Sequence, residues 1–251
     1  MTPDMPLPQA DTRFMIVAQA RSGSTLLREA LNAEPDIVCH GEAFSRVWID
    51  RMVPRPDQDV LTADQIRAML PCRDADPLQF MAERVMPFPG MVTGFKIIYD
   101  DFIDPRFQDK LTGYAHQNGL RIIHLRRLNP VAALASRTRM FRFGLGHSDR
   151  PQRKADAAEA EKITIPPREL DQYMRRQNRL AEQIDGLFPD AFQARYETLG
   201  TDYPHIVAHL GLPDTRDFIA PLSKMAPPSL ATVIENYDEI ASYDTPAQPL
   251  W

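Results

Sequence analysis

The sequence predicts a three-layer α/β fold with a largely parallel central sheet, and three observations support this. Short, continuous apolar runs recur along the 251 residues, as expected for strands that are buried on both faces. Segments with helical periodicity separate these runs, which is typical of βαβ units. Hydrophobic residues make up 43% of the chain, enough for a sizeable core. We therefore expect one domain over residues 1–251, with a disordered tail over 1–12.

Strands and helices are expected to alternate, and several carry clear boundary signals. Thr62 and Asp76 are good N-caps for two helices between residues 62 and 86. Asn118-Gly119 is a strong helix stop, and Pro130 suits a first helical turn because its missing N–H would be unpaired there. The expected strands are 14–18, 37–39, 92–99, 120–125 and 192–196, and the other expected helices are 26–31, 105–117, 130–143, 167–187, 203–210 and 230–241.

Residues 144–162 differ from the rest of the chain. This stretch is polar, highly charged and almost free of large apolar side chains. Such a segment is either a mobile loop over a ligand site or a solvated surface excursion. We expect the mobile loop.

Bulk composition excludes several classes of partner. The net charge of −5 gives no reason to expect nucleic acid or an anionic membrane. Cys39 and Cys72 are the only cysteines and lack metal or redox spacing, which fits a reducing compartment. No apolar run approaches the roughly 18 residues of a membrane span. We expect a soluble, cytoplasmic protein without integral membrane contact, either monomeric or homodimeric.

The segment from residue 18 to 31, AQARSGSTLLREAL, carries the strongest chemical signal. A turn between a buried strand and a helix presents backbone N–H groups that bind a phosphate group, assisted by the helix dipole. Gly23 allows close approach of the ligand, and Arg21 adds a fixed positive charge. Hydroxyl donors at Ser22, Ser24 and Thr25 complete the site. The alternative is an ordinary N-cap, Ser22 or Ser24, that starts a core helix.

This loop is not a Walker A motif. G-x-x-x-x-G-K-[ST] requires an earlier glycine, and no lysine precedes Ser24 or Thr25. The sequence therefore disfavours an ordinary ATPase or GTPase.

ARSGSTLL after a buried strand resembles the 5′-phosphosulfate-binding loop of sulfotransferases that use 3′-phosphoadenosine-5′-phosphosulfate (PAPS). The form is that of bacterial carbohydrate sulfotransferases of the trehalose and nodulation-factor type. The segment from His124 to Ser136, HLRRLNPVAALAS, is similar to the family's 3′-phosphate-binding segment. The resemblance implies that Ser136 and either Arg126 or Arg127 hold the 3′-phosphate.

Weaker matches follow in the family's order, and together they run from about residue 14 to 241. GFKI at 94–97 is similar to a central strand motif, and YETL at 196–199 with HLGLP at 209–213 resembles YEDL followed by FLGLP. Lys224 and IENYDE at 234–239 resemble the closing segment. The chain departs from the family at Leu128, where many members have arginine, and at Thr198, which replaces the aspartate of YEDL.

The resemblance implies a P-loop NTPase-like fold with a helical cover on the acceptor side. It implies PAPS as the donor, without a metal, and a hydroxyl of a carbohydrate or glycolipid-like molecule as the acceptor. The donor would contact Arg21, Ser22, Gly23, Ser24, Thr25, Leu26, Arg126, Arg127, Ser136 and Lys224.

The catalytic base is left open between two residues that follow a predicted strand. Glu42 is one candidate, because related bacterial enzymes have Gly-Glu here, and His40 is the rival. A structural role for both is the third reading. Arg21 would also stabilise charge on the leaving phosphate, and Lys96 either assists or is solvated at the end of its strand.

Two other functions stay open: a small-molecule kinase with a P-loop, and a non-catalytic nucleotide-binding homologue. Some further signals favour ordinary roles. His205 and His209 lack a third metal ligand. The arginines between 126 and 142 suit a nucleotide better than nucleic acid. Trp48 and Trp251 are expected to be packing residues rather than sugar platforms.

Overall fold

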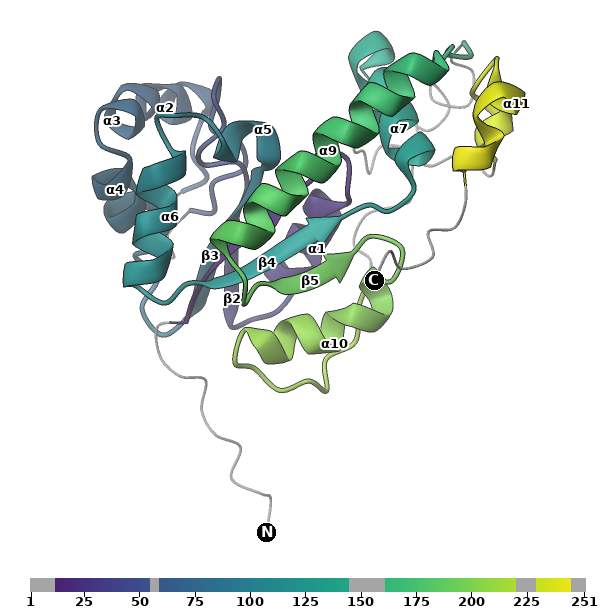
Figure 1. Ribbon diagram of the computed structural model, residues 1–251. Helices are drawn as coiled ribbons and strands as arrows, with labels where there is room; N and C mark the ends of the chain where they lie inside the picture. The colour runs from purple at the N-terminus through teal and green to yellow at the C-terminus, as the bar shows by residue number, and fades with distance from the viewer. Residues whose placement is uncertain (1–11, 55–58, 145–160, 220–228, 245–251) are drawn as a thin grey trace.

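The computed structural model describes residues 12–54, 59–144, 161–219 and 229–244. A five-stranded sheet in the order β2-β3-β1-β4-β5 forms its centre, and every neighbouring pair is parallel (Figure 1). The strands are β1 Arg13–Ala18, β2 Ile37–His40, β3 Val92–Ile98, β4 Arg121–Arg126 and β5 Phe192–Arg195. The predicted α/β class with a parallel sheet is confirmed.

Helices cover both faces of the sheet (Figure 1). One face carries α1 Ser24–Asn32 and α10 Leu199–His209. The other carries the long helix α9 Pro167–Leu187, α6 Gln108–Gln117 and the short α5 Tyr99–Phe102. A helical group beside them comprises α2 Ala63–Ala68, α3 Leu70–Ala75, α4 Pro77–Phe80 and the π-helical turn η1 Met81–Val85. The helix α7 Pro130–Phe143 follows β4 and packs on α9.

Strand side chains alternate between two core clusters, one on each face of the sheet. On β1, Met15 and Val17 join the cluster under α6 and α9, whereas Phe14 and Ile16 join the cluster under α1 and α10. A third cluster lies beneath α7 and includes Leu170 at the start of α9. Since β1 lies in the middle of the sheet and both its faces are buried, its carboxyl end is fixed from every side. That rigidity positions the loop that follows it.

Helix boundaries follow the expected chemistry at three places. Thr62 forms a complete capping box with Gln65, and Asp76 accepts hydrogen bonds from the backbone N–H groups of Leu78 and Gln79. The Asn129 side chain caps α7 at Ala132, with Pro130 in the first turn. Such caps each stabilise a helix by about 1 kcal/mol. The residue types that form them therefore predict where these helices begin.

The prediction of one helix over 230–241 is wrong. The segment forms the 3-10 turns η2 Leu230–Thr232 and η3 Ala241–Tyr243, with the short α11 Tyr237–Ile240 between them. Ile234 makes a parallel bridge to Ile163 instead, through backbone hydrogen bonds from Ile163 to Val233 and from Glu235 to Ile163. Tertiary pairing therefore replaces the local helical bonds.

Smaller differences concern helix limits. Residues 62–86 form four short helical segments instead of two helices, and α10 begins at Leu199 rather than 203. The expected tail over 1–12 and most of the expected loop over 144–162 lie outside the described residues. Among the described residues, none of the helices combines the length and apolar character that a bilayer span needs.

Candidate active site

The loop after β1, residues 19–23, adopts a conformation that only glycine tolerates at its last position. Gly23 is the N-cap of α1 with φ of 81°, in the left-handed region. A Cβ on Gly23 would lie 2.5 Å from Cδ2 of Tyr196. Glycine is therefore required both for its backbone angle and for the ring that packs against it. The backbone of Arg21 is also left-handed, with φ of 67°.

The N-terminus of α1 offers donors for an anion. The side chain of Ser22 is fully buried, and its Oγ has no hydrogen-bond partner among the described residues. The first backbone N–H groups of a helix likewise lack partners within it and carry partial positive charge. A buried hydroxyl without a partner, next to a helix start and a glycine turn, fits a bound phosphate or sulfate group.

Arg21 joins the two segments that were predicted to bind the donor. Its Nε donates to Oγ of Ser136 on α7 at 3.0 Å. Nη1 of Arg127, at the end of β4, donates to the backbone oxygen of Arg21 at 3.4 Å. The Arg127 guanidinium lies over the Tyr196 ring, 4.6 Å from its centroid. The structure thus brings Arg21, Arg127 and Ser136 together, although 115 positions separate the first from the last.

Positive charge is concentrated in this cluster at an electrostatic cost. Burial, followed by the charge of Arg127, lowers the pKa of Arg21, while Glu42 acts in the opposite direction. Burial also lowers the pKa of Arg127, opposed by Tyr196 and Glu197. Both shifts disfavour the charged forms, and a bound anion would relieve them. The site therefore has the electrostatics of an anion receptor.

Glu42 forms an ion pair with a buried lysine. Lys96 on β3 is 3% exposed, and its Nζ donates to Oε1 of Glu42 at 2.7 Å and to Oγ1 of Thr25 at 3.3 Å. Lys96 lies opposite Ile16 on β1, and therefore points at the start of α1. The reading of Lys96 as a solvated strand end is wrong. A buried ammonium group needs such partners.

His40 is the other predicted candidate for the base, and both of its ring nitrogens contact backbone groups. Its ring is fully buried; Nε2 lies 2.9 Å from the Val85 carbonyl, and Nδ1 accepts from the Val53 backbone N–H at 3.0 Å. These partners fix the neutral tautomer with the proton on Nε2. Burial lowers the pKa of His40 to about 4. With both nitrogens occupied by backbone groups, His40 has a structural role, and Glu42 remains as the candidate base.

Arg126 and Arg127 face different surroundings. The charge of Arg126 acts on Tyr99 and His124, both on the α9 side of the sheet. Arg127 contacts the loop after β1 instead. Arg127 is therefore the better candidate for a phosphate shared with Ser136.

The other four predicted donor residues differ in burial and in whether the structure describes them. Ser24 and Thr25 are buried in the first turn of α1. Leu26 is half-buried and packs on the apolar cluster beneath that helix. Lys224 lies outside the described residues.

Several residues of the site had no assigned role in the sequence. Gln19 accepts from the Arg127 backbone N–H at 3.0 Å and donates to the Tyr173 hydroxyl at 2.9 Å. The Glu197 carboxylate accepts from the backbone N–H groups of Leu128 and Asn129. The turn before α7 is thus fixed through its backbone, whatever side chain occupies position 128. The YETL match contained Tyr196 and Glu197, but residue spacing alone does not reveal these contacts.

Other sequence signals have structural explanations. His209 contacts the Ile122 carbonyl through Nε2 at 3.2 Å. Within the described ranges there is no cluster of three or more His, Cys, Asp and Glu residues that could hold a metal ion. Trp48 is 55% exposed, which contradicts its expected role in packing. Trp251 lies outside the described residues.

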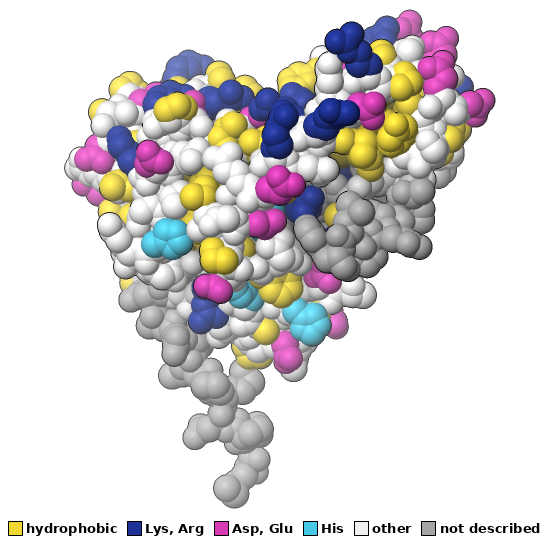
Figure 2. All heavy atoms as spheres, in the orientation of Figure 1, with side chains coloured by type: hydrophobic (Ala, Val, Ile, Leu, Met, Phe, Trp, Pro, Cys, Tyr) yellow, Lys and Arg dark blue, Asp and Glu magenta, His cyan; other side chains and the backbone are white. Residues whose placement is uncertain are grey.

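Arginine and lysine side chains gather along the upper margin of the molecule, where its outline is notched between the α5 side and the α7 side (Figure 2). Arg176 on α9 pairs with Asp100 on α5. Local basic surface therefore coexists with the net charge of −5.

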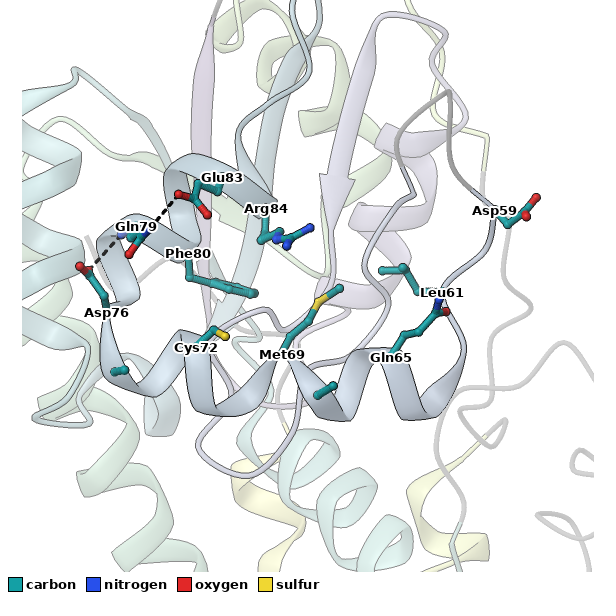
Figure 3. Close-up of a pocket in the computed structure, with 12 residues that line it drawn as sticks. Asp59, Leu61, Gln65, Met69, Cys72, Asp76, Gln79, Phe80, Glu83 and Arg84 are labelled. Atoms are coloured by element: carbon teal, nitrogen blue, oxygen red, sulfur yellow. Dashed lines mark hydrogen bonds between the residues drawn. The ribbon is translucent and has the colours of Figure 1, made fainter.

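A separate cavity of about 940 Å³ lies in the helical group α2 to η1. Phe80, Met69 and Leu61 point into it, and Asp76, Gln79 and Glu83 form a hydrogen-bonded row at one side (Figure 3). None of the predicted site residues lines it.

The comparisons with known proteins complete this description. No family model matches the chain, and no curated protein matches it. Among solved structures, it is similar to the crystal structure of a sulfotransferase from Alicyclobacillus acidocaldarius. The two are 15% identical over 93% of this chain and 91% of the other, with a TM-score of 0.47. A likeness at this level carries no argument about activity, which has to come from the residues themselves.

Proposed function

We propose that the protein is a sulfotransferase that moves a sulfuryl group from PAPS to a hydroxyl of a carbohydrate or glycolipid-like acceptor. The observation that carries this proposal is the contact between Arg21 and Ser136 beside Arg127. It brings a helix N-terminus and a second basic segment together, so that donors for two anionic groups lie in one cluster. A nucleotide with phosphates on both the 5′ and 3′ positions of one ribose matches that arrangement.

The residues present fit the donor at both ends. The buried, unpartnered Ser22 hydroxyl and the glycine turn at Gly23 suit the 5′-phosphosulfate, together with the first amides of α1. Arg127 and Ser136 would hold the 3′-phosphate, because a guanidinium and a hydroxyl bind the same anion well. Arg21 lies between the two and would contact the 5′ side.

Glu42 is the proposed general base. In the transfer step, the acceptor oxygen attacks sulfur, the bond between sulfur and the bridging oxygen of the 5′-phosphate breaks, and the hydroxyl proton passes to Glu42. Lys96 binds only Oε1 of Glu42, so Oε2 has no hydrogen-bond partner in the described part of the chain and is available for that proton. Such transfers pass through loose transition states, so positioning and charge stabilisation by Arg21 and Lys96 contribute most of the catalysis.

The first test is calorimetric titration with 3′-phosphoadenosine 5′-phosphate (PAP), against ATP and AMP. We expect a Kd on the order of micromolar for PAP and weaker binding of the other two nucleotides. Arg127→Ala and Ser136→Ala should weaken PAP binding by roughly tenfold or more, because a charge-assisted contact is lost. Arg142→Ala is the matched control, since Arg142 is an exposed arginine on α7 that pairs with Glu161.

Two outcomes would contradict the proposal. A preference for Mg·ATP over PAP would favour the small-molecule kinase. Selective PAP binding without transfer to any hydroxyl acceptor would favour the non-catalytic homologue.

A further inference from the structure

The chain between Gly41 and Arg51 is a closed loop with the candidate base at its neck. The Gly41 backbone N–H donates to the Arg51 carbonyl at 2.9 Å, and the Asp50 N–H donates to the Glu42 carbonyl at 3.3 Å. The two ends of the loop therefore meet where Glu42 projects. We call residues 42–50 the neck loop. Compact loops of this kind often carry function.

A fully buried arginine holds the neck loop from inside. Nη1 of Arg73, on α3, donates to the carbonyl of Ser45 at 2.7 Å and to that of Trp48 at 2.9 Å. It also reaches the Ala43 carbonyl at 3.4 Å. Nη2 of Arg73 lies 2.8 Å from the Asp74 carboxylate, which compensates the buried charge. One guanidinium thus fixes three carbonyl groups of the loop.

A second arginine ties the outer part of the neck loop to α5. The Asp101 carboxylate on α5 accepts from both the backbone N–H of Arg46 at 3.0 Å and its Nε at 3.1 Å. Within the neck loop, the Ser45 backbone N–H donates to the Glu42 carbonyl at 3.4 Å, so the segment that precedes Arg46 is tied to the backbone of the candidate base. Phe44 packs edge-to-face on Phe80, the residue that points into the cavity of Figure 3.

Although it is held at these points, the neck loop exposes three consecutive large side chains. Arg46 is half exposed, Val47 is 70% exposed and Trp48 is 55% exposed. The contacts of Arg73 and Arg46 already hold the loop, so its folding does not require the indole of Trp48 to be exposed to water. A rigid, exposed aromatic ring beside a basic group is typical of a ligand-contact surface, because little conformational entropy is lost on binding.

We propose that the neck loop is the acceptor-binding platform, and that Trp48 stacks on a pyranose ring of the acceptor. Arg73 is the positioning residue that keeps this platform in place relative to Glu42. Nη groups of Arg46 not used by Asp101 would donate to hydroxyl groups of the sugar. This inference rests on the proposed sulfuryl transfer for its chemistry, but sugar binding by Trp48 can be tested without it.

The binding test uses tryptophan fluorescence. The chain has two tryptophans, so Trp251→Phe leaves Trp48 as the sole reporter. Titration of this variant with trehalose and with chitotriose, in the presence of PAP, should give a saturable change in emission with at least one of the sugars. No saturable change with either sugar overturns the platform. Saturation by p-cresol but by neither sugar overturns the assignment of the acceptor class.

The kinetic test separates acceptor contacts from donor contacts. Trp48→Ala should raise the acceptor KM by about tenfold and leave the PAP affinity unchanged, with partial rescue in Trp48→Phe. Phe141→Ala is the matched control, because Phe141 is an exposed aromatic residue on α7 outside the neck loop. An unchanged acceptor KM in Trp48→Ala overturns the inference. Failure of the wild type to bind PAP would instead overturn the proposed function and leave the fluorescence result to decide the platform.

Arg73 is tested by Arg73→Lys, which keeps the charge but replaces the forked donor group with a single ammonium. We expect a higher acceptor KM and easier acrylamide quenching of Trp48, with unchanged PAP affinity. Arg67→Lys is the control from the same helical group, where the arginine is exposed and pairs with Asp64. Equal quenching and KM in Arg73→Lys and the wild type would overturn the positioning role. A folded variant is verified by its circular dichroism spectrum.

Discussion

The proposed donor side and the proposed acceptor side of the site are built differently. On the donor side, charged and hydroxyl groups stand at strand ends and a helix start, and they contact each other directly, as Arg21 does with Ser136. On the acceptor side, a single buried guanidinium, Arg73, organises a loop through its carbonyl groups. The proposed donor side thus depends on two segments that follow the neighbouring strands β1 and β4. The proposed acceptor side depends on one arginine from a helix outside the sheet.

This difference has a consequence for specificity. The donor groups are fixed by β1 and β4, which are central strands buried on both faces. The neck loop is fixed by helices outside the sheet, and these can change without disturbing the strands. On the proposed assignment of the two sides, we expect that acceptor preference can be altered while donor binding is retained.

The largest effect is expected at Glu42, where the two sides meet. Glu42→Gln should lower kcat by about 10³-fold, equivalent to roughly 4 kcal/mol of barrier, because the base is lost. PAP affinity measured by calorimetry should be retained, since the donor contacts remain. Asp109→Asn, an exposed carboxylate on α6, is the control. A kcat within about threefold of wild type would exclude Glu42 as the base.

A second variant tests the donor side alone. Gly23→Ala should weaken PAP binding by more than about tenfold and destabilise the fold by about 2–4 kcal/mol, since it adds left-handed strain and a clash with Tyr196. Gly90→Ala separates the two causes, because Gly90 has φ of 77° but no neighbour within 4 Å. It should cost only about 1 kcal/mol in urea unfolding. Equal costs for both variants would contradict the role of Tyr196.

The acceptor side should make stability depend on pH through His40. Burial lowers its pKa from 6.5 to about 4, so the unfolded chain binds more protons between these pH values. Stability from this group is therefore present above pH 6.5 and is lost as the pH falls toward 4. The loss amounts to about 3 kcal/mol. In urea unfolding at pH 5 and 7, His40→Gln should show a smaller drop than wild type, and an equal drop would refute the prediction.

The smallest effect concerns the two thiols, which precede His40 and Arg73 in the sequence. Cys39 on β2 is buried, and burial raises its pKa to about 12, whereas Cys72 is exposed and lines the cavity in Figure 3. A thiol reagent should modify one thiol in the native protein and two in urea, because the thiolate is the reactive form. PAP affinity should not change on modification. Two reactive thiols in the native state would contradict this prediction, because they would show that the sheet opens at its edge strand β2 and exposes Cys39.

The sequence predicted the donor side better than the acceptor side for a physical reason. A strand, a glycine turn and a helix start are adjacent in the chain, so residues 14–31 specify their own geometry. Pro130 and the Asn129 cap likewise fix the start of α7 and hence the position of Ser136. By contrast, the contact of Lys96 with Glu42 depends on the β2–β3 register, which is not encoded locally.

Acceptor-side residues were harder to predict because burial was the deciding property. His40 follows a strand and has a titratable ring, so it looked like a base, but Val85 and Val53 occupy both of its nitrogens. Arg73 gave no sequence signal, since an arginine inside a short helix is usually solvated. The failure at 230–241 has the same origin, because the Ile163 bridge is a tertiary pairing.

Helix α9 links the two sides mechanically. Its 21 residues extend about 31 Å. Leu170 and Tyr173 near its start pack in the cluster under α7, and Leu180 and Ile184 near its end pack in the cluster that contains Phe44. Helix α9 thus shares buried surface with α7, which carries Ser136, and with Phe44 of the neck loop. Unfolding of either side would expose part of α9, so we expect the proposed donor and acceptor sides to unfold together.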